Sequence, residues 1–382
     1  MQRERYAARA INRRRRVVGC AHFRLSQWTA GGSQWLRETS RADTTEKMEP
    51  RSFVDGRDEY APAPHTTDYI LCGWRVRSSV VLPEVMPWAG DNRPPDITIR
   101  LGSAPPIPDP IWQPAHGVTR IGRDGACRIA SANIGCFHIA HGREVVVEPY
   151  ADPETIELRA WLLGPVLGTL CHQRGLFPLH ASCIRIGGSA VALTGRPGAG
   201  KSTLATALVR RGHGLVADDV CVIDSTTPDG PTVLPAFPRL KLWEDAMQSL
   251  RIPVEGTPRA RSDRAKFHFC QPGSFDPSPV KLRAIYVLDR SLTADSDSIE
   301  PERGTGAADA LAREIFRPGI GFHLGRKVAL LDAALRIASA VPVFRMPLRP
   351  DLPRIDATAA RVEAHFASFT IKVCETITSG AG

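Results

Sequence analysis

The chain has 382 residues, of which 43% are hydrophobic and 23% charged, as in an ordinary soluble globular protein. It has no run of about 18 apolar residues, and no apolar block follows the N-terminal arginines. We therefore expect a cytoplasmic protein without a membrane partner or a secretory signal. Residues 1–47 hold 11 Lys and Arg against 4 Asp and Glu, which accounts for +7 of the net charge of +9. The remaining +2 does not predict a nucleic-acid partner.

The sequence predicts three segments. Residues 1–67 are expected to be a disordered basic arm and linker, and Met48 is an alternative start of translation. Residues 68–150 are expected to form a mostly-β domain, and residues 151–382 an α/β domain. The nine cysteines are odd in number and widely spaced without a Cys-x-x-Cys, which argues against disulfides and a zinc site.

Short apolar runs separated by Gly, Pro and Asn predict the strands of the mostly-β domain. One run carries His138 and leads to His141, but two such histidines are more often surface residues than metal ligands, so we predict no metal site there. The expected strands cover residues 70–72, 80–82, 97–99, 126–130, 136–140 and 144–147.

The second domain begins with apolar residues at helical spacing over residues 154–176. Two apolar runs around Gly187-Gly188 then predict a β-hairpin. Further elements are expected as strands at residues 217–223 and 284–288 and as helices near residues 307–316 and 326–340.

A complete phosphate-loop pattern, G-x-x-x-x-G-K-[ST], follows the second hairpin strand and precedes an apolar helix that starts near Thr203. Its glycines allow backbone N–H groups to point at phosphate oxygens, and the helix directs its positive end toward the same anion. Lys201 is predicted to contact the β and γ phosphates, and Ser202 to bind Mg²⁺. The sequence thus predicts an ATP-binding site formed by Gly195, Arg196, Pro197, Gly198, Ala199, Gly200, Lys201, Ser202 and Thr203.

Two adjacent carboxylates, Asp218 and Asp219, stand in the apolar run at residues 217–223. Burying them is costly unless they bind something, and neighbours on a strand point to opposite faces. We therefore expect one, assigned here as Asp218, to hold Mg²⁺ with Ser202, and one to accept a proton from a substrate hydroxyl. Which of the two is the base stays open. The alternative is a pair that caps a strand end at the surface.

The ordered set of Leu179-His180-Ala181-Ser182, the hairpin, GRPGAGKST, RRGH and Leu-Val-Ala-Asp-Asp resembles the catalytic domain of HPr kinase/phosphorylase. The resemblance is sharp over residues 177–223 and weaker to about residue 348. It implies that Lys201 and Ser202 take the phosphates and Mg²⁺, that the aspartate pair supplies the metal contact and the base, and that His180 lies near the transferred phosphoryl group. Members of the family form hexamers, which makes a homo-oligomer an option, although the N-terminal half differs.

The sequence also departs from that family. Thr203 replaces the glutamate that usually follows the P-loop serine, and the Gly-rich segment linked to phosphorolysis is not visible. The arrangement downstream looks like the HPr-kinase-like serine kinases found beside peptide-maturation genes, including those for lasso peptides. That subgroup implies phosphorylation of a serine on a precursor peptide or small protein.

Four basic residues downstream are candidates for contact with phosphate or with an acidic peptide, or are ordinary solvated charges. Besides a serine kinase, the sequence allows a small-molecule kinase on the same scaffold, or a non-catalytic nucleotide-binding module whose β-rich half recruits a partner. It does not choose between ATP and GTP, name the acceptor or show whether phosphorylase activity exists. The four basic candidates are Arg239, Lys241, Arg264 and Lys266.

Overall fold

The computed structural model describes residues 66–114, 118–260, 262, 264–271, 273–289, 298–347 and 354–379. The arm and linker expected over residues 1–67, with Met48, therefore lie outside the described residues, apart from the last two positions. No helix among the described residues is long and apolar enough to cross a membrane.

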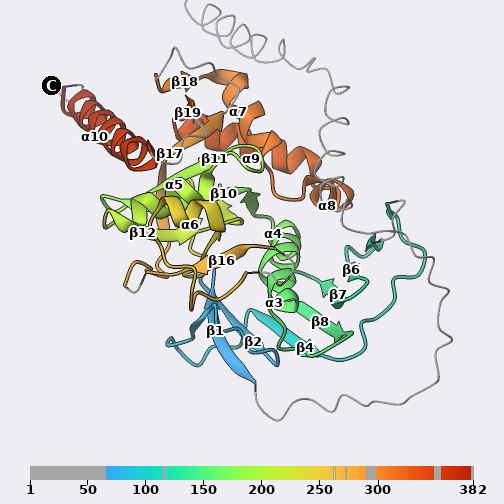
Figure 1. The fold of residues 1–382 in the computed structure, drawn as a ribbon. Helices are drawn as coiled ribbons and strands as arrows, with labels where there is room; N and C mark the ends of the chain where they lie inside the picture. Colours follow the sequence, from blue (N-terminus) through green and yellow to red (C-terminus); the bar gives the residue numbers. More distant parts are fainter. Residues whose placement is uncertain are drawn as a thin grey trace, which may run out of the picture. The chain divides into compact units, whose positions relative to one another are not determined.

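The first sheet has eight described strands in the order β3-β1-β2-β4-β8-β7-β6-β5 (Figure 1). Its pairs are antiparallel except that β4 runs parallel to both β2 and β8. The mostly-β character predicted here is confirmed. The strands are β1 (Thr67–Leu71), β2 (Trp74–Ser78), β3 (Met86–Pro87), β4 (Ile97–Leu101), β5 (Thr119–Ile121), β6 (Cys127–Ser131), β7 (Gly135–Ala140) and β8 (Glu144–Pro149).

The prediction of a strand at residues 80–82 is wrong, because this segment is a loop whose apolar side chains are buried in the core. Val80 and Leu82 are 2% and 0% exposed, so the apolar residues of this run reflect burial of their side chains and not the pairing of a strand with a neighbour. Its backbone is satisfied by side chains: the Val80 N–H donates to Ser78 Oγ at 3.0 Å, and the Leu82 N–H donates to the Tyr69 hydroxyl at 3.0 Å.

The helix expected over residues 154–176 is present in three parts: α3 (Ile156–Trp161), the π-helical turn η2 (Leu162–Val166) and α4 (Leu167–Gln173). Pro165 lies inside η2 and cannot donate a backbone hydrogen bond, which is the usual reason for such an irregularity. In Figure 1 the helical segment lies between the two sheets, and α4 contacts both β7 and β9 (Phe177–Leu179).

The second sheet follows the order β12-β10-β11-β17-β14-β13-β9 among the described strands, with β19 joined to β17 and β18. β11 runs parallel to β17, and β17 parallel to β19. The predicted hairpin is confirmed as β10 and β11, with Gly187 and Gly188 both at positive φ. The strands are β10 (Ala181–Ile186), β11 (Ser189–Thr194), β12 (Gly214–Ala217), β13 (Cys221–Asp224), β14 (Thr232–Leu234), β17 (Val280–Asp289), β18 (Glu300–Glu302) and β19 (Val343–Pro347).

The helices of this part cover the second sheet. α5 packs on β10 and β11, α10 packs on α5, and α7 packs on α9. The fold is therefore the α/β arrangement expected for a P-loop protein, joined to a mostly-β sheet. The helices are α5 (Lys201–Arg210), α6 (Glu244–Ser249), α7 (Gly304–Arg313), α8 (Pro318–His323), α9 (Lys327–Ala340) and α10 (Ile355–Ser379).

A separate two-stranded ribbon, β15 (Leu240–Trp243) and β16 (Lys266–Phe269), lies beside α5. Side chains alternate between its two faces. Leu240, Leu242 and Phe267 join the buried core around α5. The register then places the polar residues on the other face, where Lys241 is opposite His268 and Trp243 is opposite Lys266.

Candidate functional site

The phosphate loop connects β11 directly to α5, as the sequence predicts. Gly195, Gly198 and Gly200 have φ values of 133°, 78° and 98°, which L side chains rarely adopt. A Cβ atom at Gly195 would lie 2.5 Å from the carbonyl oxygen of Leu288, so this position accepts only glycine. The loop therefore has the conformation that lets its N–H groups converge on an anion.

Lys201 is 7% exposed, and its Nζ donates to the carbonyl oxygen of Gly195 at 2.6 Å. Burial lowers the pKa of Lys201, and this effect is opposed by the negative charges of Glu314, Asp219 and Asp218. The ammonium is thus held at the loop, with carboxylates around it that keep it charged.

The prediction that Asp218 and Asp219 lie inside one continuous strand is wrong. They occupy the break between β12 and β13, which pair with different neighbours in the sheet. Asp219 adopts a φ of 72°, which is unusual for a residue with a side chain. The reversal of the backbone, and not strand alternation, gives the two carboxylates different surroundings.

Asp218 is 4% exposed and accepts hydrogen bonds on both oxygens. Its Oδ1 accepts from Ser182 Oγ at 2.6 Å and from Ser202 Oγ at 2.9 Å, and its Oδ2 accepts from the Lys241 N–H at 2.9 Å. This aspartate joins the P-loop serine to the hairpin and to the ribbon.

Asp219 faces the basic side chains of Lys241, His180 and Lys266, and its own side chain is 31% exposed. Its carboxylate is 3.1 Å from Lys241 Nζ and 3.3 Å from His180 Nδ1. Burial raises the pKa of Asp219, but Lys241, His180 and Lys266 outweigh burial and hold the pKa well below its usual range. Asp219 is therefore an ionised carboxylate with a side open to solvent, whereas Asp218 is enclosed.

The oxygens of Ser202 and Asp218 fit a magnesium ion. Two neighbouring ligands of an octahedral Mg²⁺ at about 2.1 Å from the metal lie about 3 Å apart. Ser202 Oγ and Asp218 Oδ1 are separated by 2.9 Å. No group of three or more His, Cys, Asp or Glu side chains among the described residues could hold a metal, so nucleotide phosphates or water would complete the shell.

The four basic candidates divide into two pairs. Lys241 contacts Asp219, and Asp219 opposes the lowering of the pKa of Lys266 that burial causes. Lys266 also lies over the Trp243 ring, with Nζ 5.5 Å from the centroid. Arg239 instead donates to the carbonyl oxygen of Pro83 at 3.4 Å, and the carbonyl of Arg264 accepts the Lys266 N–H at 2.8 Å. The ribbon thus brings the two lysines to the aspartates.

His180 lies between β9 and β10, and its ring stacks on Phe316 at 6.0 Å between centroids. Its backbone N–H donates to the carbonyl oxygen of Glu314 at 2.7 Å. The segment between α7 and α8 therefore reaches the site, and it carries Glu314 and Arg317 close to the charged groups named above. Burial raises the pKa of Glu314, which Lys201 opposes, and burial lowers the pKa of Arg317 to about 10.

Sequence reasoning missed Ser182, Glu314 and Arg317. A signal for Ser182 exists, because a hydroxyl in the middle of an apolar strand needs a partner. Glu314 and Arg317 stand in a connection more than 90 positions beyond the aspartates. No local pattern marks that connection.

The Arg-Gly-His segment after α5 serves the packing of α10. Arg211 Nη2 lies 2.7 Å and His213 Nε2 2.8 Å from the carboxylate of Glu363. These contacts fix the end of α5 against the C-terminal helix.

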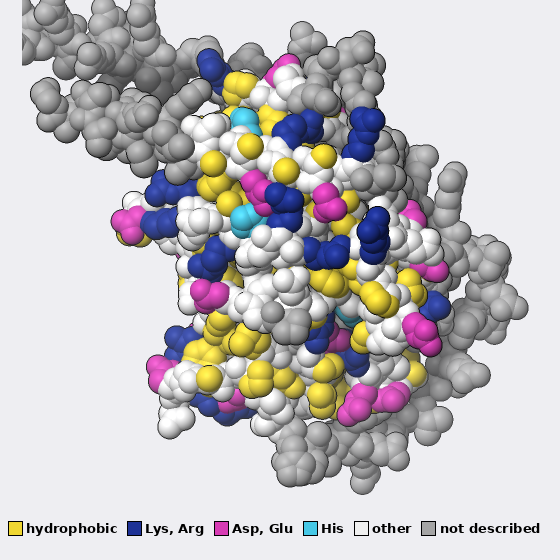
Figure 2. Space-filling model, turned by 60° about the vertical axis from the view of Figure 1, so that its left-hand side comes forward, with side chains coloured by type: hydrophobic (Ala, Val, Ile, Leu, Met, Phe, Trp, Pro, Cys, Tyr) yellow, Lys and Arg dark blue, Asp and Glu magenta, His cyan; other side chains and the backbone are white. Residues whose placement is uncertain are grey.

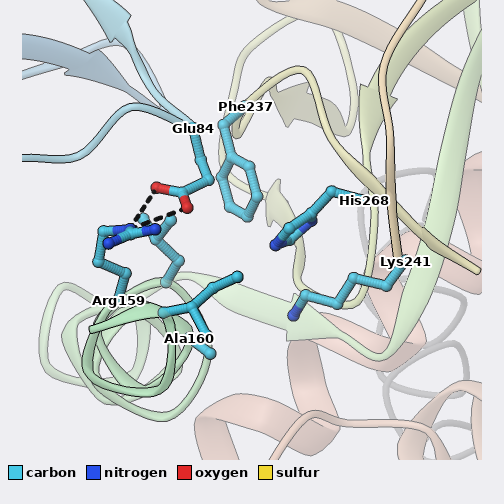
Figure 3. A pocket seen from close by; sticks show the side chains of 8 residues that line it. Glu84, Arg159, Ala160, Phe237, Lys241 and His268 are labelled. Carbon is cyan, nitrogen blue, oxygen red and sulfur yellow. Dashed lines mark hydrogen bonds and ion pairs between the residues drawn. The ribbon is translucent and has the colours of Figure 1, made fainter. Parts of the chain in front are cut away.

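A small cavity of about 10 Å³ lies behind Lys241, room for about one water molecule. Figure 3 shows Lys241 and His268 pointing into it from the ribbon, opposite the ion pair of Glu84 and Arg159 at 2.9 Å. His268 Nδ1 is buried and has no hydrogen-bond partner among the described residues, and burial together with Lys241 lowers the pKa of His268 to about 3. The ribbon therefore keeps a neutral imidazole beside Lys241.

The strand–loop–helix geometry defines a P-loop α/β protein with two aspartates beside the loop. Residues 176–233 match the HPr Serine kinase C-terminal domain family, so this segment is HPr-kinase-like. The HPr kinase/phosphorylase of Pelodictyon phaeoclathratiforme is 52% identical over 59 residues, which are 15% of this chain and 18% of that protein. The HPr kinase/phosphorylase of Aromatoleum aromaticum is 30% identical over 164 residues, or 41% of this chain and 46% of that protein.

The chain thus spans less than half the length of each of these relatives. Among solved structures, the Hpr(Ser) kinase/phosphatase from Coxiella burnetii is similar at 16% identity with a TM-score of 0.32. That match covers 53% of this chain and 95% of the other.

Proposed function

We propose that this protein is an ATP-dependent serine kinase that transfers the γ-phosphoryl group to a serine hydroxyl of a peptide or small protein. The observation that carries the proposal is the difference in surroundings between the two aspartates. Asp218 is enclosed and bound to the P-loop serine, whereas Asp219 is partly open and held by Lys241 and His180. A module that only binds nucleotide has no use for the second, ionised carboxylate.

In the proposed reaction the acceptor hydroxyl donates its proton to an oxygen of Asp219 as its oxygen forms a bond to the γ-phosphorus. The bond between that phosphorus and the bridging oxygen of the β-phosphate breaks, and ADP leaves with the electron pair. Lys201 holds the phosphates, and His180 fixes the orientation of Asp219. Mg²⁺, when bound at Ser202 and Asp218, neutralises phosphate charge.

Asp219 is the proposed base because its carboxylate has an exposed side that a hydroxyl can reach. Asp218 is only 4% exposed, and its oxygens are held by Ser182, Ser202 and the Lys241 N–H. The lowered pKa of Asp219 keeps it ionised at neutral pH, so it is always ready to accept a proton, although it is a weak base. Orientation of the hydroxyl is then its larger contribution.

A peptide acceptor is favoured over a small molecule by the ribbon. Trp243, which is 45% exposed, and the less exposed Lys241 and Lys266 lie on one face of two adjacent strands, and a surface aromatic beside two lysines suits an acidic peptide. The face drawn in Figure 2 mixes Lys and Arg with Asp and Glu, unlike the uniformly basic surface of nucleic-acid-binding proteins. A precursor peptide from a maturation cluster, such as a lasso-peptide precursor, fits this requirement.

The test is transfer of label from γ-labelled ATP to serine-containing peptides encoded near the gene, in the presence of Mg²⁺. We expect label on a peptide serine, and none with the Lys201→Ala variant. Binding of ATP without transfer to any peptide, while small hydroxyl compounds become labelled, would move the assignment to a small-molecule kinase. Binding of ATP without transfer of label to any acceptor would favour a non-catalytic nucleotide-binding module.

A further inference from the structure

A row of cationic side chains crosses one face of the first sheet. The register places Arg120 of β5 opposite Arg128 of β6, and Arg128 opposite His138 of β7. The row continues through Val146 of β8 to Arg100 of β4. The other face of the same strands is filled by apolar residues that are 0% exposed, namely Ile121, Ile129, Phe137, Ile139 and Val147.

Arg120 and Arg128 are not neutralised. Neither forms an ion pair with a described residue. The Nε atom of each is buried, with no hydrogen-bond partner in the part of the chain that the structure describes. Like charges directly opposite each other on neighbouring strands are destabilising, and an unsatisfied buried N–H adds to that cost. Such a local conflict in an otherwise regular sheet is typical of a binding site.

The neighbouring groups leave the pair available for an anion. Arg128 donates hydrogen bonds to the Tyr150 hydroxyl and the Cys136 thiol, and burial raises the pKa of both groups, so these partners are neutral and leave the guanidinium charge uncompensated. Glu148 is on the same face, but its Oε2 accepts from the Ala104 N–H at 3.0 Å. Asp124, in the β5–β6 turn, accepts from the Ala126 N–H at 3.0 Å.

We propose that Arg120 and Arg128 form a phosphomonoester-binding site in the mostly-β sheet, separate from the P-loop. The two guanidinium groups start from backbone positions about 5 Å apart. Their terminal N–H groups can enclose a tetrahedral dianion from two sides, with the half-exposed Tyr150 hydroxyl as a third donor. A carboxylate, with one charge and two oxygens, satisfies only one of the two forks.

The phosphate can come from a phosphorylated serine of a peptide or from free inorganic phosphate. The proposal does not rest on the kinase activity, since the site is built from residues of the first sheet alone. A phosphoserine product would nevertheless carry the group that this site accepts.

The test is calorimetric titration of the full chain carrying Lys201→Ala, so that the P-loop does not contribute. The probes are a phosphoserine peptide, the same peptide with serine, the same peptide with aspartate, and inorganic phosphate. We expect the phosphoserine peptide to bind at least tenfold more tightly than the other two peptides. The double variant Arg120→Gln/Arg128→Gln should weaken it at least tenfold, and Arg123→Gln, which removes an exposed charge from the adjacent turn, should not change it.

If inorganic phosphate binds as tightly as the phosphoserine peptide, and the double variant loses that binding, the free anion is the ligand and the site is still supported. Equal binding of the aspartate peptide, no binding of any phosphate probe, or unchanged binding in the double variant would overturn it. If the double variant unfolds at a lower temperature, Arg120→Lys/Arg128→Lys keeps both charges and removes the planar forks. Undiminished binding by that variant would then overturn the proposal.

Discussion

Replacing Asp219 by asparagine separates proton transfer from nucleotide binding. Asparagine tolerates the left-handed backbone, so the φ of 72° adds little strain. The side chain loses its charged contacts with Lys241 and His180, which are only 14% and 17% exposed, so the cost in stability is up to about 3 kcal/mol. Loss of a positioned base should reduce kcat by about 10²- to 10⁴-fold, which is about 3 to 5 kcal/mol of barrier.

The assay is steady-state transfer from ATP to the peptide, with nucleotide affinity measured separately in Mg²⁺. Asp219→Asn should bind Mg-ATP within about threefold of the native protein, because Ser202 and Asp218 are untouched. Asp218→Asn should instead weaken Mg²⁺-dependent binding. Asp229→Asn, which changes a side chain that is 85% exposed, is the matched control and should leave both quantities unchanged. An Asp219→Asn variant with more than a tenth of the native kcat would refute the assignment of the base.

Three further outcomes are expected. Ser182→Ala should destabilise the fold by about 1.5–3 kcal/mol, because the Ser182 hydroxyl donates to the buried Asp218 carboxylate. Ser249→Ala removes a buried hydroxyl that has no partner among the described residues and should cost nothing, and denaturant unfolding compares the two variants. The pKa of His268 is about 3 in the folded state against 6.5 in the unfolded state. The free energy of unfolding should therefore fall by about 1.4 kcal/mol per pH unit as the pH drops from 6.5 toward 3. The variant His268→Gln should show a flatter slope in acid-unfolding curves. Since burial lowers the pKa of Lys201, kcat/KM should decline at a pH below the usual lysine value of 10.5, and a pH–rate profile with an unchanged alkaline limb would contradict this.

The parts of the site that depend on contiguous residues could be predicted from the sequence alone. The strand–loop–helix unit is local, since only glycines adopt the backbone of the loop and only an apolar strand and helix support it. The hairpin at Gly187 and Gly188 is local for the same reason. The α/β class and the mostly-β segment followed from periodicity, which each element carries in its own residues.

The difference between the two aspartates depends on contacts between distant parts of the chain. Alternation along a strand predicted opposite faces, but the chain breaks between β12 and β13 because these strands join different neighbours, and Asp219 takes the left-handed turn. The partners of each carboxylate then come from afar: Ser182 from the hairpin and Lys241 from the ribbon. Glu314 and Arg317 reach the site only through the packing of the connection between α7 and α8. Contacts between residues far apart in the chain produce no periodic pattern in the sequence. Only the folded structure could therefore show that Asp218 contacts the P-loop serine and that Asp219 contacts Lys241 and His180.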